Sequence, residues 1–369
     1  MKIQKKELLE ILSKCMPGVE TGKNSIEGAN TFIFTKGNVF TFNDSISVTV
    51  PLKLLGLMDE LEGAVSANEF YKIIQKMPKD EIEIESSEKS WHLKSGRSKI
   101  EVNLIDCDYS KFEKNLDRSG KWQNVAEDFL SALKICSINS NKTKYSGIVV
   151  KGNCAYSTDG VQMNKATMKS EMPSFWISDS TVKELLKLNK LDKVQQTGNW
   201  LHFKTGNIYF SVKVLDISQY PVDTVEKVLD GSEEKAGKTE FQFPKKIKEV
   251  IDRASSFAGK EQEYDVVKIN VTEEKIFISS QCFAGKFKES VKWDSDIKGI
   301  EPFMIYVDST MILEMLSRTS KFKLVEGPVK DGKKTNRLLF VSENSVNLMV
   351  TISGSDDDEE QVNEFSFFF

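Results

Sequence analysis

The feature that most limits the fold of this chain is a helix-starting pattern that occurs three times. It reads "VSANEFYKIIQKM" at 65–77, "SDSTVKELLKL" at 178–188 and "DSTMILEML" at 308–316. Each copy begins with small polar residues suited to a helix N-cap and continues with apolar residues at spacings of three and four, the period of an amphipathic helix. The Asp-Ser-Thr match and the apolar match of the last two copies differ by one residue, so the sequence leaves their register open.

A second apolar helix precedes each of these three. The buried faces of the earlier helices are predicted to be Leu8, Ile11, Leu12 and Cys15; Phe129, Leu133 and Cys136; and Ile247, Val250, Ile251, Ala254 and Phe257. These helices recur after roughly 120 residues, a period that exceeds a solenoid repeat and fits a duplicated whole domain.

Alternating apolar and polar residues between the helices predict antiparallel strands and hairpins. These stretches are 30–52, 81–105, 199–215, 267–280 and 336–353, with turns at 36–38, Gly96 and Gly206. The expected fold class is therefore α+β, with three tandem domains that each pack two helices on antiparallel sheet. Polar, glycine-bearing segments at 119–120 and 230–238 separate domains 1–119, 120–238 and 239–353, and a tail follows at 354–369.

The sequence carries no sign of catalysis. His92 and His202 stand at matching places in equivalent hairpins and are interpreted as strand residues. The five cysteines are scattered without CxxC or metal-ligand spacing, as expected for buried thiols in a reducing compartment. No nucleotide-binding or hydrolase motif occurs, so we expect no enzyme, no cofactor and no metal site. Because no apolar run approaches ~20 residues and charges interrupt the N-terminal segment, we expect neither a membrane span nor a signal peptide.

The charge is unevenly distributed along the chain. The formal net charge is −4, but the last fifteen residues, "SDDDEEQVNEFSFFF", hold six acids and no base, which leaves the preceding body at +2. The body therefore has room for a basic face, although net charge alone does not identify a partner.

Three strings connect these features to a known family: "LKSGRSKIEVNLIDCDYSKF" at 93–112, "STDGVQM" at 157–163 and "FSVKVLDISQYPVD" at 210–223. In their order and spacing over residues 1–353, the chain resembles the bacterial DNA polymerase III β subunit, the sliding clamp, as a divergent or phage-encoded member. The resemblance implies a cytoplasmic, non-catalytic DNA replication protein, in a bacterium or an infected host cell. It would form a head-to-tail homodimer, a ring that a clamp loader closes around duplex DNA and that tethers the replicative DNA polymerase as a processivity factor. The alternative is a ring-forming structural or assembly protein that acts without DNA.

Such a ring would direct the polar faces of six helices toward the duplex, where basic residues attract phosphates without reading sequence. The predicted DNA-facing residues are Lys14, Lys72, Lys76, Lys134, Lys183, Lys187, Lys190, Lys246, Arg253 and Arg318, with Lys142 and Lys144 in the loop at 139–147. The alternative is that these side chains only solvate exposed helix faces. Interspersed glutamates predict that the attraction is weak.

The resemblance also implies a hydrophobic cleft between the second and third domains, which binds partner peptides of the approximate pattern Gln-Leu-Ser/Asp-Leu-Phe. The residues carried over are Tyr145, Thr158, Gly160, Val161, Gln162, Met163, Pro221, Lys227, Val228, Tyr264, Asp308, Met311, Leu339, Met349, Val350, Thr351 and Ile352. The apolar anchors of the peptide are expected to meet Met163, Val228, Met349 and Ile352. Plain core is the alternative for Met163 and Val350. The family's usual His-Arg-Leu is here Val-Gln-Met at 161–163, which suggests a clamp tuned to its own polymerase.

The implied dimer interface joins the first domain of one copy to the third domain of another through strand edges. Its predicted residues are Ile100 and Val102 in the first domain and Ser256 and Phe257 in the third. The alternative for Phe257 is the core beneath its own helix.

The tail needs a separate explanation. Its acidic run at 356–360 is typical of a solvated leash, but the terminal Phe365, Phe367, Phe368 and Phe369 are not explained by solubility. Residues 365–368 resemble the clamp-binding peptide pattern, so one hypothesis is that the tail docks in the cleft of its own or a neighbouring clamp and competes with partners. The other two are docking on another replication protein and packing on the last strand.

Overall fold

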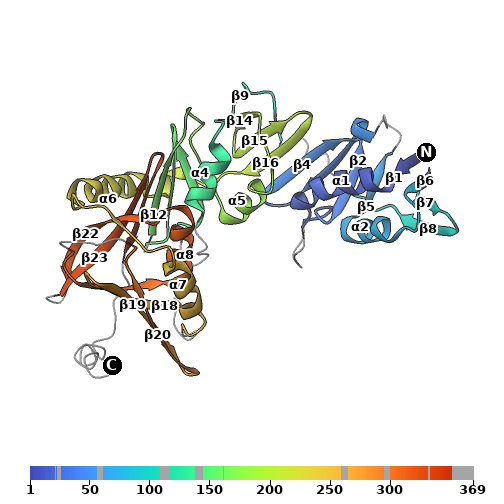
Figure 1. The fold of residues 1–369 in the computed structure, drawn as a ribbon. Coiled ribbons are helices and arrows are strands. Elements are labelled where there is room, and N and C mark those ends of the chain that lie inside the picture. The colour runs from blue at the N-terminus through green and yellow to red at the C-terminus, as the bar shows by residue number, and fades with distance from the viewer. Residues whose placement is uncertain are drawn as a thin grey trace. The chain divides into compact units, whose positions relative to one another are not determined.

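The computed structural model describes residues 1–20, 22, 26–55, 61–108, 116–137, 144–160, 162–258, 265–294, 300–330 and 333–350. The chain divides into two compact units (Figure 1). Unit 1 comprises 1–130, 150–152 and 169–217, and unit 2 comprises 131–149, 153–168 and the residues from 218 onward. The division passes through the predicted middle domain because the strands of that domain are built into two different sheets.

All six predicted helices form. They are α1 (Lys5–Cys15), α2 (Ala67–Lys76), α4 (Phe129–Cys136), α5 (Asp179–Leu185), α7 (Ile247–Ser255) and α8 (Ser309–Arg318). The three repeated starts align at the N-cap residues Ser66, Ser178 and Asp308. The Ser178 Oγ accepts a hydrogen bond from the Thr181 N–H at 3.3 Å, and the Asp308 Oδ1 accepts one from the Met311 N–H at 3.0 Å. The apolar spacing therefore sets the register of the three helices. The Asp-Ser-Thr tripeptides of the second and third copies are offset by one position relative to their N-cap residues.

The described residues contain a seventh helix that the sequence did not predict, α6 (Val222–Lys235). It occupies most of the segment 230–238 that was predicted to be a polar domain boundary. Val222, Val225 and Leu229 form its buried face, at spacings of three and four. This helix was missed because that apolar face is narrow and charged residues surround it, so packing on a sheet stabilises it more than its own pattern does. Short 3₁₀ turns occur at Met16–Gly18, Leu52–Leu55 and Ile217–Gln219.

Unit 1 contains two antiparallel sheets and one further strand, β13, which belongs to neither of them. Its strands are β1 (Lys2–Gln4), β2 (Thr31–Thr35), β3 (Asn38–Phe42), β4 (Ile46–Pro51), β5 (Gly63–Ser66), β6 (Glu81–Ser86), β7 (Ser90–Ser95), β8 (Ser98–Asn103), β9 (Gln123–Asn124), β13 (Phe175–Ile177), β14 (Lys193–Thr197), β15 (Trp200–Thr205) and β16 (Ile208–Lys213). One sheet has the order β1-β6-β7-β8, and the other has the order β5-β2-β3-β4-β16-β15-β14-β9. The pairing of β4 with β16 joins strands of the first repeat to strands of the second. The predicted strand residues His92 and His202 lie in β7 and β15.

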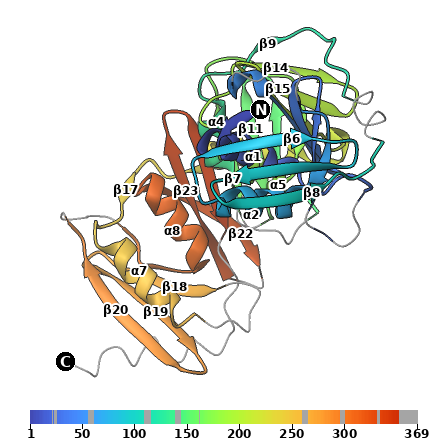
Figure 2. The same ribbon diagram turned by 90° about the vertical axis from the view of Figure 1, so that its right-hand side faces the viewer.

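Unit 2 repeats this design. Its strands are β11 (Cys154–Thr158), β12 (Gln162–Thr167), β17 (Phe241–Gln242), β18 (Val266–Val271), β19 (Lys275–Cys282), β20 (Gly285–Lys292), β21 (Phe303–Asp308), β22 (Lys321–Lys330), β23 (Lys333–Ser342) and β24 (Ser345–Val350), and β10 (Ile148–Lys151) crosses the division between the units. The strands β11-β12-β24-β23-β22-β17 are consecutive in one sheet, and the other sheet has the order β20-β19-β18-β21. In Figure 2, β20 is the outer strand beside β19, and α7 and α8 cover the same sheet.

Each unit has its own apolar core. In unit 1, Phe34, Phe70 and Trp91 meet edge to face, with ring centroids 4.9–6.1 Å apart. In unit 2, the Phe243 and Phe322 rings stack at 4.2 Å. These packed cores hold the helices and the sheet edges in fixed positions, which the candidate sites require.

Candidate functional site

The β11–β12 hairpin of unit 2 carries the central residues of the predicted cleft. The Asp159 N–H donates to the Gln162 carbonyl at 3.2 Å, and the Asp159 Oδ1 accepts from the Gln162 N–H at 2.6 Å. Gly160 has a φ of +90°, a conformation that favours glycine because it has no Cβ. The Thr-Asp-Gly string therefore specifies a tight turn, and this turn orients the start of β12.

Strand register places some of the predicted cleft residues on one face of the sheet. Thr158 pairs with Met163, Met163 with Leu348, and Leu348 with Leu339. Directly paired residues of neighbouring strands point to the same face, so these side chains form one row across four strands.

The helix α6 covers this face, which we call the α6 face. The Tyr156 hydroxyl donates to the Glu226 Oε1 at 2.8 Å, and the Lys165 Nζ lies 3.4 Å from the Asp230 Oδ1. Tyr156 and Lys165 are each two residues from the Thr158–Met163 pair, so they share its face. Burial and the Glu226 hydrogen bond raise the pKa of Tyr156, which keeps this hydroxyl protonated as a donor.

Half-exposed apolar groups are available for binding on and around α6. Met163 of β12 and Val228 of α6 are half-buried, Lys227 is exposed, and Pro221 is the N-cap residue of α6. The Tyr145 ring packs edge to face on Tyr220 with centroids 5.8 Å apart, and the Lys144 Nζ lies 4.8 Å from the centre of the Tyr145 ring. These groups suit an apolar peptide that also carries negative charge.

Several predicted cleft residues belong to the other face or to the core, which corrects the sequence prediction. Gln162 pairs with Met349, one position along the strand from the row that contains Met163. The side chains of Gln162 and Met349 therefore face away from α6. Met349 is 1% exposed and Met311 is 9% exposed, and both pack in the core with α7 and α8. Met349 was expected to accept an anchor, but it is buried in the core, whereas Met163, for which core was the alternative, is half-buried.

Further members of the predicted set have other positions or are not described. Leu339 is 1% exposed on the α6 face, and Asp308 caps α8. Val161, Tyr264, Thr351, Ile352 and the tail phenylalanines lie outside the described residues, as does the Val350 side chain.

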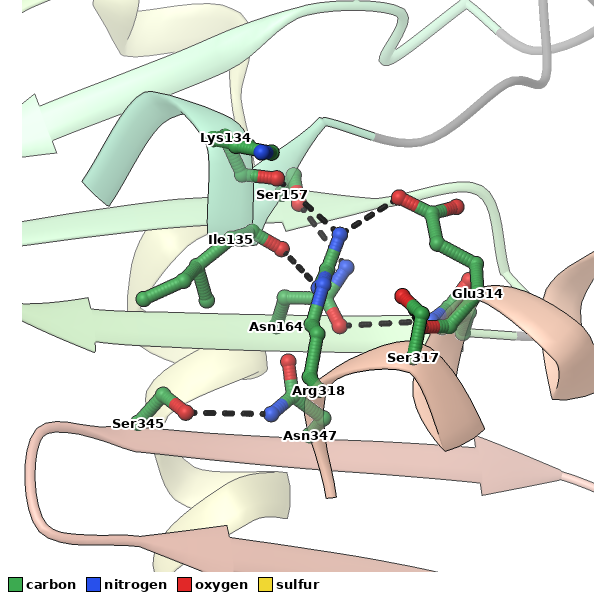
Figure 3. Close-up of polar contacts among 10 residues, drawn as sticks. Lys134, Ile135, Ser157, Asn164, Glu314, Ser317, Arg318, Ser345 and Asn347 are labelled. Atoms are coloured by element: carbon green, nitrogen blue, oxygen red, sulfur yellow. Dashed lines mark hydrogen bonds and ion pairs between the residues drawn. The ribbon is translucent and has the colours of Figure 1, made fainter. Parts of the chain in front are cut away.

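Arg318 was predicted to face DNA, but its side chain binds groups within unit 2. Its guanidinium donates to the carbonyls of Lys134, at 3.0 Å, and of Ile135, and to the Glu314 Oε1 at 2.5 Å (Figure 3). The side chain is 19% exposed. Because the last carbonyls of a helix have no partner within the helix, the cation supplies donors at the C-terminus of α4. Burial raises the pKa of Glu314 although Arg318 opposes that shift.

A buried polar row lies beside this contact and was not foreseen. The Gln162 Nε2 donates to the Asn164 Oδ1 at 3.3 Å, and the Asn164 Nδ2 donates to the Ser157 Oγ at 3.2 Å. The Asn347 Nδ2 donates to the Ser345 Oγ at 3.3 Å (Figure 3). The Asn164–Ser157 bond joins β12 to β11 on the face opposite α6, whereas the other two bonds lie within β12 and within β24.

The other predicted DNA-facing cations are on the surface, and several have acidic partners. Exposed lysines are Lys72, Lys76, Lys134, Lys144, Lys183 and Lys246. Ion pairs join Lys14 to Glu10 at 2.7 Å, Lys187 to Glu184 at 2.7 Å, Lys190 to Asp192 at 2.8 Å and Arg253 to Glu289 at 2.7 Å. Lys187 and Lys190 follow α5 instead of lying on it, Lys246 is the N-cap residue of α7, and Lys142 lies outside the described residues.

The predicted dimer residues lie at or beside sheet edges. Ile100 and Val102 are half-buried on β8, the terminal strand of its sheet in the described structure. Ser256 is the C-cap residue of α7. The Phe257 ring stacks on Phe287 of β20 with centroids 6.1 Å apart. The sequence prediction omitted Phe283, which is 93% exposed at the tip of the β19–β20 hairpin.

Within the described ranges, no group of three or more His, Cys, Asp or Glu side chains is arranged to hold a metal ion. Over the same part of the chain, no helix has the length and apolar character needed to cross a membrane.

Known structures share this fold, although no protein-family model and no curated protein sequence matches the chain. The DNA polymerase sliding clamp of Bacillus subtilis has a TM-score of 0.74 and 20% identity, over 96% of this chain and 99% of that one. The β chain of DNA polymerase III from Streptococcus pneumoniae has a TM-score of 0.75 and 15% identity over the same shares. The Helicobacter pylori β clamp, solved with 3,4-difluorobenzamide, has a TM-score of 0.73 and 18% identity, over 96% of this chain and 100% of that one. The chain therefore has the sliding-clamp fold along nearly its whole length, which confirms the predicted α+β class.

Proposed function

We propose that this protein is a DNA sliding clamp, a non-catalytic processivity factor whose ring encloses duplex DNA and tethers the replicative DNA polymerase. The observation that carries the proposal is similarity to the clamp fold over 96% of the chain. The helix pairs of the three repeats and the terminal strands β8 and β20 support it. Tethering needs enclosure and a high local concentration of polymerase, so no bond has to be made or broken.

The surface cations fit a ring that slides. Lys72 and Lys76 on α2 and Lys134 on α4 are exposed and can attract phosphates from any sequence. Ion pairs such as Lys14 with Glu10 reduce the net attraction. Weak attraction lets the duplex move through the ring, while topology prevents its loss.

Partner proteins would bind on the α6 face of unit 2. Met163 and Val228 would accept apolar side chains of a short peptide, and the Tyr145 ring and Lys227 would border them. The polymerase and the clamp loader would compete for this face, since both are proposed to use the same peptide pattern.

The test is retention on circular DNA. The full chain is loaded onto a singly nicked plasmid with a bacterial clamp loader and ATP, and bound protein is separated by gel filtration in about 0.5 M salt, where phosphate contacts are screened. A clamp stays with the circle and is lost when one restriction cut linearises the plasmid. Equal retention before and after the cut, or no retention on the circle, would reject the function. The solution mass should be about twice 41.8 kDa.

A further inference from the structure

The four-stranded sheet of unit 2 has the order β20-β19-β18-β21, and its two faces differ in chemistry. One face packs on α7 and α8, where Ile269, Ile278 and Ile305 belong to the same apolar core as Ile251 and Ile312 (Figure 2). Because side chains alternate along a strand, the intervening residues point to the opposite face, which we call the lysine face. Its lysines are Lys268, Lys275, Lys286, Lys288 and Lys292.

The lysine face has a strong excess of positive charge. Besides the five lysines, its strands contribute one acid, Asp308. The Asp308 carboxylate accepts hydrogen bonds from the Met311 N–H at 3.0 Å and from the Asp265 N–H at 3.2 Å, so it is engaged at the start of α8. Glu273 and Glu274 lie at one end of the face, in the turn between β18 and β19. Five lysines and one acid give the strands of this face a charge of +4.

The other four-stranded sheet shows that this excess is not a general property of the fold. On the face that alternates with its buried residues, the β1-β6-β7-β8 sheet presents three lysines and four glutamates, a charge of −1. The Lys2 Nζ lies 2.8 Å from the Glu81 carboxylate, and the Lys94 Nζ lies 3.1 Å from the Glu83 carboxylate. The sheet of unit 1 therefore neutralises its lysines internally, whereas the strands of the lysine face supply one acid for five lysines.

Two of these lysines face each other directly. Lys275 of β19 pairs with Lys292 of β20, and like charges in directly opposed positions destabilise a sheet. Among the described residues, neither lysine forms an ion pair with an acid. In unit 1, Lys94 also pairs with a lysine, Lys99, but there the Glu83 carboxylate relieves the repulsion. On the lysine face, an anionic ligand would do so.

Two aromatic rings lie among the lysines. Tyr306 of β21 pairs with Lys268 of β18, and Phe277 of β19 lies in the next row of outward residues, opposite Asn270. The Lys268 Nζ lies 5.4 Å from the centre of the Tyr306 ring, and the Lys275 Nζ lies 4.8 Å from the centre of the Phe277 ring. Both rings are half-buried. The face therefore presents the same combination twice, an aromatic ring with a cation beside it.

This combination indicates the chemistry of the ligand. A single strand of DNA offers unstacked bases to aromatic rings and a phosphate beside each base to lysines, and open sheet faces with aromatic residues bind single strands in this way. In a duplex the bases are stacked on one another, so the two rings would add nothing to binding. An acidic protein segment would use the lysines but give the rings no specific role.

We propose that the lysine face binds single-stranded DNA without sequence preference, with bases stacked on Phe277 and Tyr306 and phosphates held by Lys268, Lys275 and Lys292. All of these residues belong to unit 2 of one chain, so the site needs neither a ring nor a second copy. For a clamp it is a second contact with DNA, which acts on an unpaired strand and is added to enclosure of the duplex.

Oligonucleotides test the ligand. Binding of the full chain to a fluorescein-labelled thymidine oligomer of about 12 nucleotides is measured by anisotropy in about 0.1 M salt and compared with an abasic oligomer of the same length. The thymidine oligomer should bind at least about tenfold more tightly, because only it has bases to stack. The log–log slope of its affinity against salt should be about −3.5, the value for five phosphate contacts on a single strand. Equal binding of the two oligomers, or equally tight binding of a polyglutamate peptide, would overturn the proposal.

Charge reversal locates the site. K292E removes one phosphate contact and puts opposite charges on the two residues that now repel, so the sheet should stay folded by circular dichroism. It should raise the dissociation constant of the thymidine oligomer about five- to tenfold. K99E is the matched control, because Lys99 is also exposed on a terminal strand and also pairs with a lysine, Lys94. An effect of K292E below about twofold, or an equal effect of K99E, would locate the binding elsewhere and reject the lysine face.

The rings are tested separately with F277L/Y306L, which keeps apolar side chains but removes both aromatic faces. The thymidine oligomer should then bind as weakly as the abasic one, whose affinity should not change. An unchanged ratio between the two oligomers would contradict the role of the rings, and if this variant does not fold, K292E and K99E still decide. Retention on the nicked circle is an independent readout. A chain that stays on the circle but binds no single strand keeps the clamp function and loses this site, and the opposite result does the reverse.

Discussion

Replacing Arg318 with methionine should open the α4–α8 contact of unit 2 without unfolding unit 1. Methionine keeps the apolar stem but removes the donors to the Lys134 and Ile135 carbonyls and the cation beside Glu314. The end of α4 then loses its cap, and a carboxylate that is 24% exposed loses its partner.

The magnitude follows from these contacts. Breaking a fully buried ion pair from one side costs about 3–5 kcal/mol. Because the Arg318 side chain is 19% exposed, we expect a smaller loss, about 2–3 kcal/mol for opening of unit 2. E314Q in the same chain should recover about 1 kcal/mol, since it removes the uncompensated buried charge.

The pH dependence of this loss has a definite sign. Burial raises the folded-state pKa of Glu314, and in R318M the carboxyl loses the charge that opposes this rise. A carboxyl with a raised folded pKa binds its proton more tightly in the folded chain than in the unfolded one. Its contribution to stability is therefore present below the unfolded pKa and is lost as pH rises through the folded pKa. R318M should lose more stability at pH 8 than at pH 5, and R318M/E314Q should show no such difference.

Two buried thiols provide the assay. Cys15 in unit 1 and Cys136 in unit 2 are both 0% exposed. The other three cysteines, Cys107, Cys154 and Cys282, are replaced by serine in every variant. Burial raises the pKa of Cys136 to about 12, so at pH 7.5 it reacts with a maleimide only when unit 2 opens.

The labelling rate at each cysteine is followed by peptide mass spectrometry. A loss of about 2–3 kcal/mol should raise the Cys136 rate roughly 30- to 150-fold and leave the Cys15 rate unchanged. A Cys136 rate within about twofold of the parent would refute the structural role given to Arg318. An equal rise at Cys15 would show a global effect instead of a local one.

Three further predictions address other parts of the chain. His202 is 0% exposed, and burial, with the Arg118 charge, lowers its pKa to about 4, so unit 1 should lose stability as pH falls from about 6.5 toward 4. The variant H202Q should reduce this pH dependence of stability, measured by urea unfolding with Cys15 protection as the readout, and an unchanged dependence would contradict the assignment to His202. M163D should weaken binding of a Gln-Leu-Ser-Leu-Phe peptide at least about tenfold by calorimetry, while the control T167D, on the same face at the far end of β12, should not. Equal effects of the two variants would show that Met163 is not part of the partner site. Deleting residues 355–369 should raise the affinity for the same peptide if the tail competes for that site, and an unchanged affinity would eliminate this hypothesis.

Much of the local structure follows from the sequence. The cap-plus-apolar pattern predicts all six helices of the three repeats, because N-cap preference and helical spacing act over a few neighbouring residues. The hairpins around Gly96 and Gly206 are equally local, since both glycines have the positive φ that a two-residue turn needs. The sliding-clamp fold is visible from the order of these local signals.

The candidate site could be predicted only in part. The sequence identifies the turn at 158–162, but it does not show that Met163 is half-exposed while Met349 is 1% exposed. That difference depends on how β12 and β24 pair, and a shift of one residue exchanges the faces of a strand. The helix α6 was also missed: its buried residues follow helical spacing, but they form a narrow apolar face that becomes stable only on the sheet beneath it.

The amino-acid sequence by itself determined the threefold repeat, the helix starts and the local hairpins, since each of these signals lies within neighbouring residues. Only the tertiary structure decided that Arg318 serves the end of α4 and that β8 and β20 are the terminal strands of their sheets. Those outcomes join residues more than a hundred positions apart. They depend on packing and register among distant segments, for which no pattern within a few residues carries information.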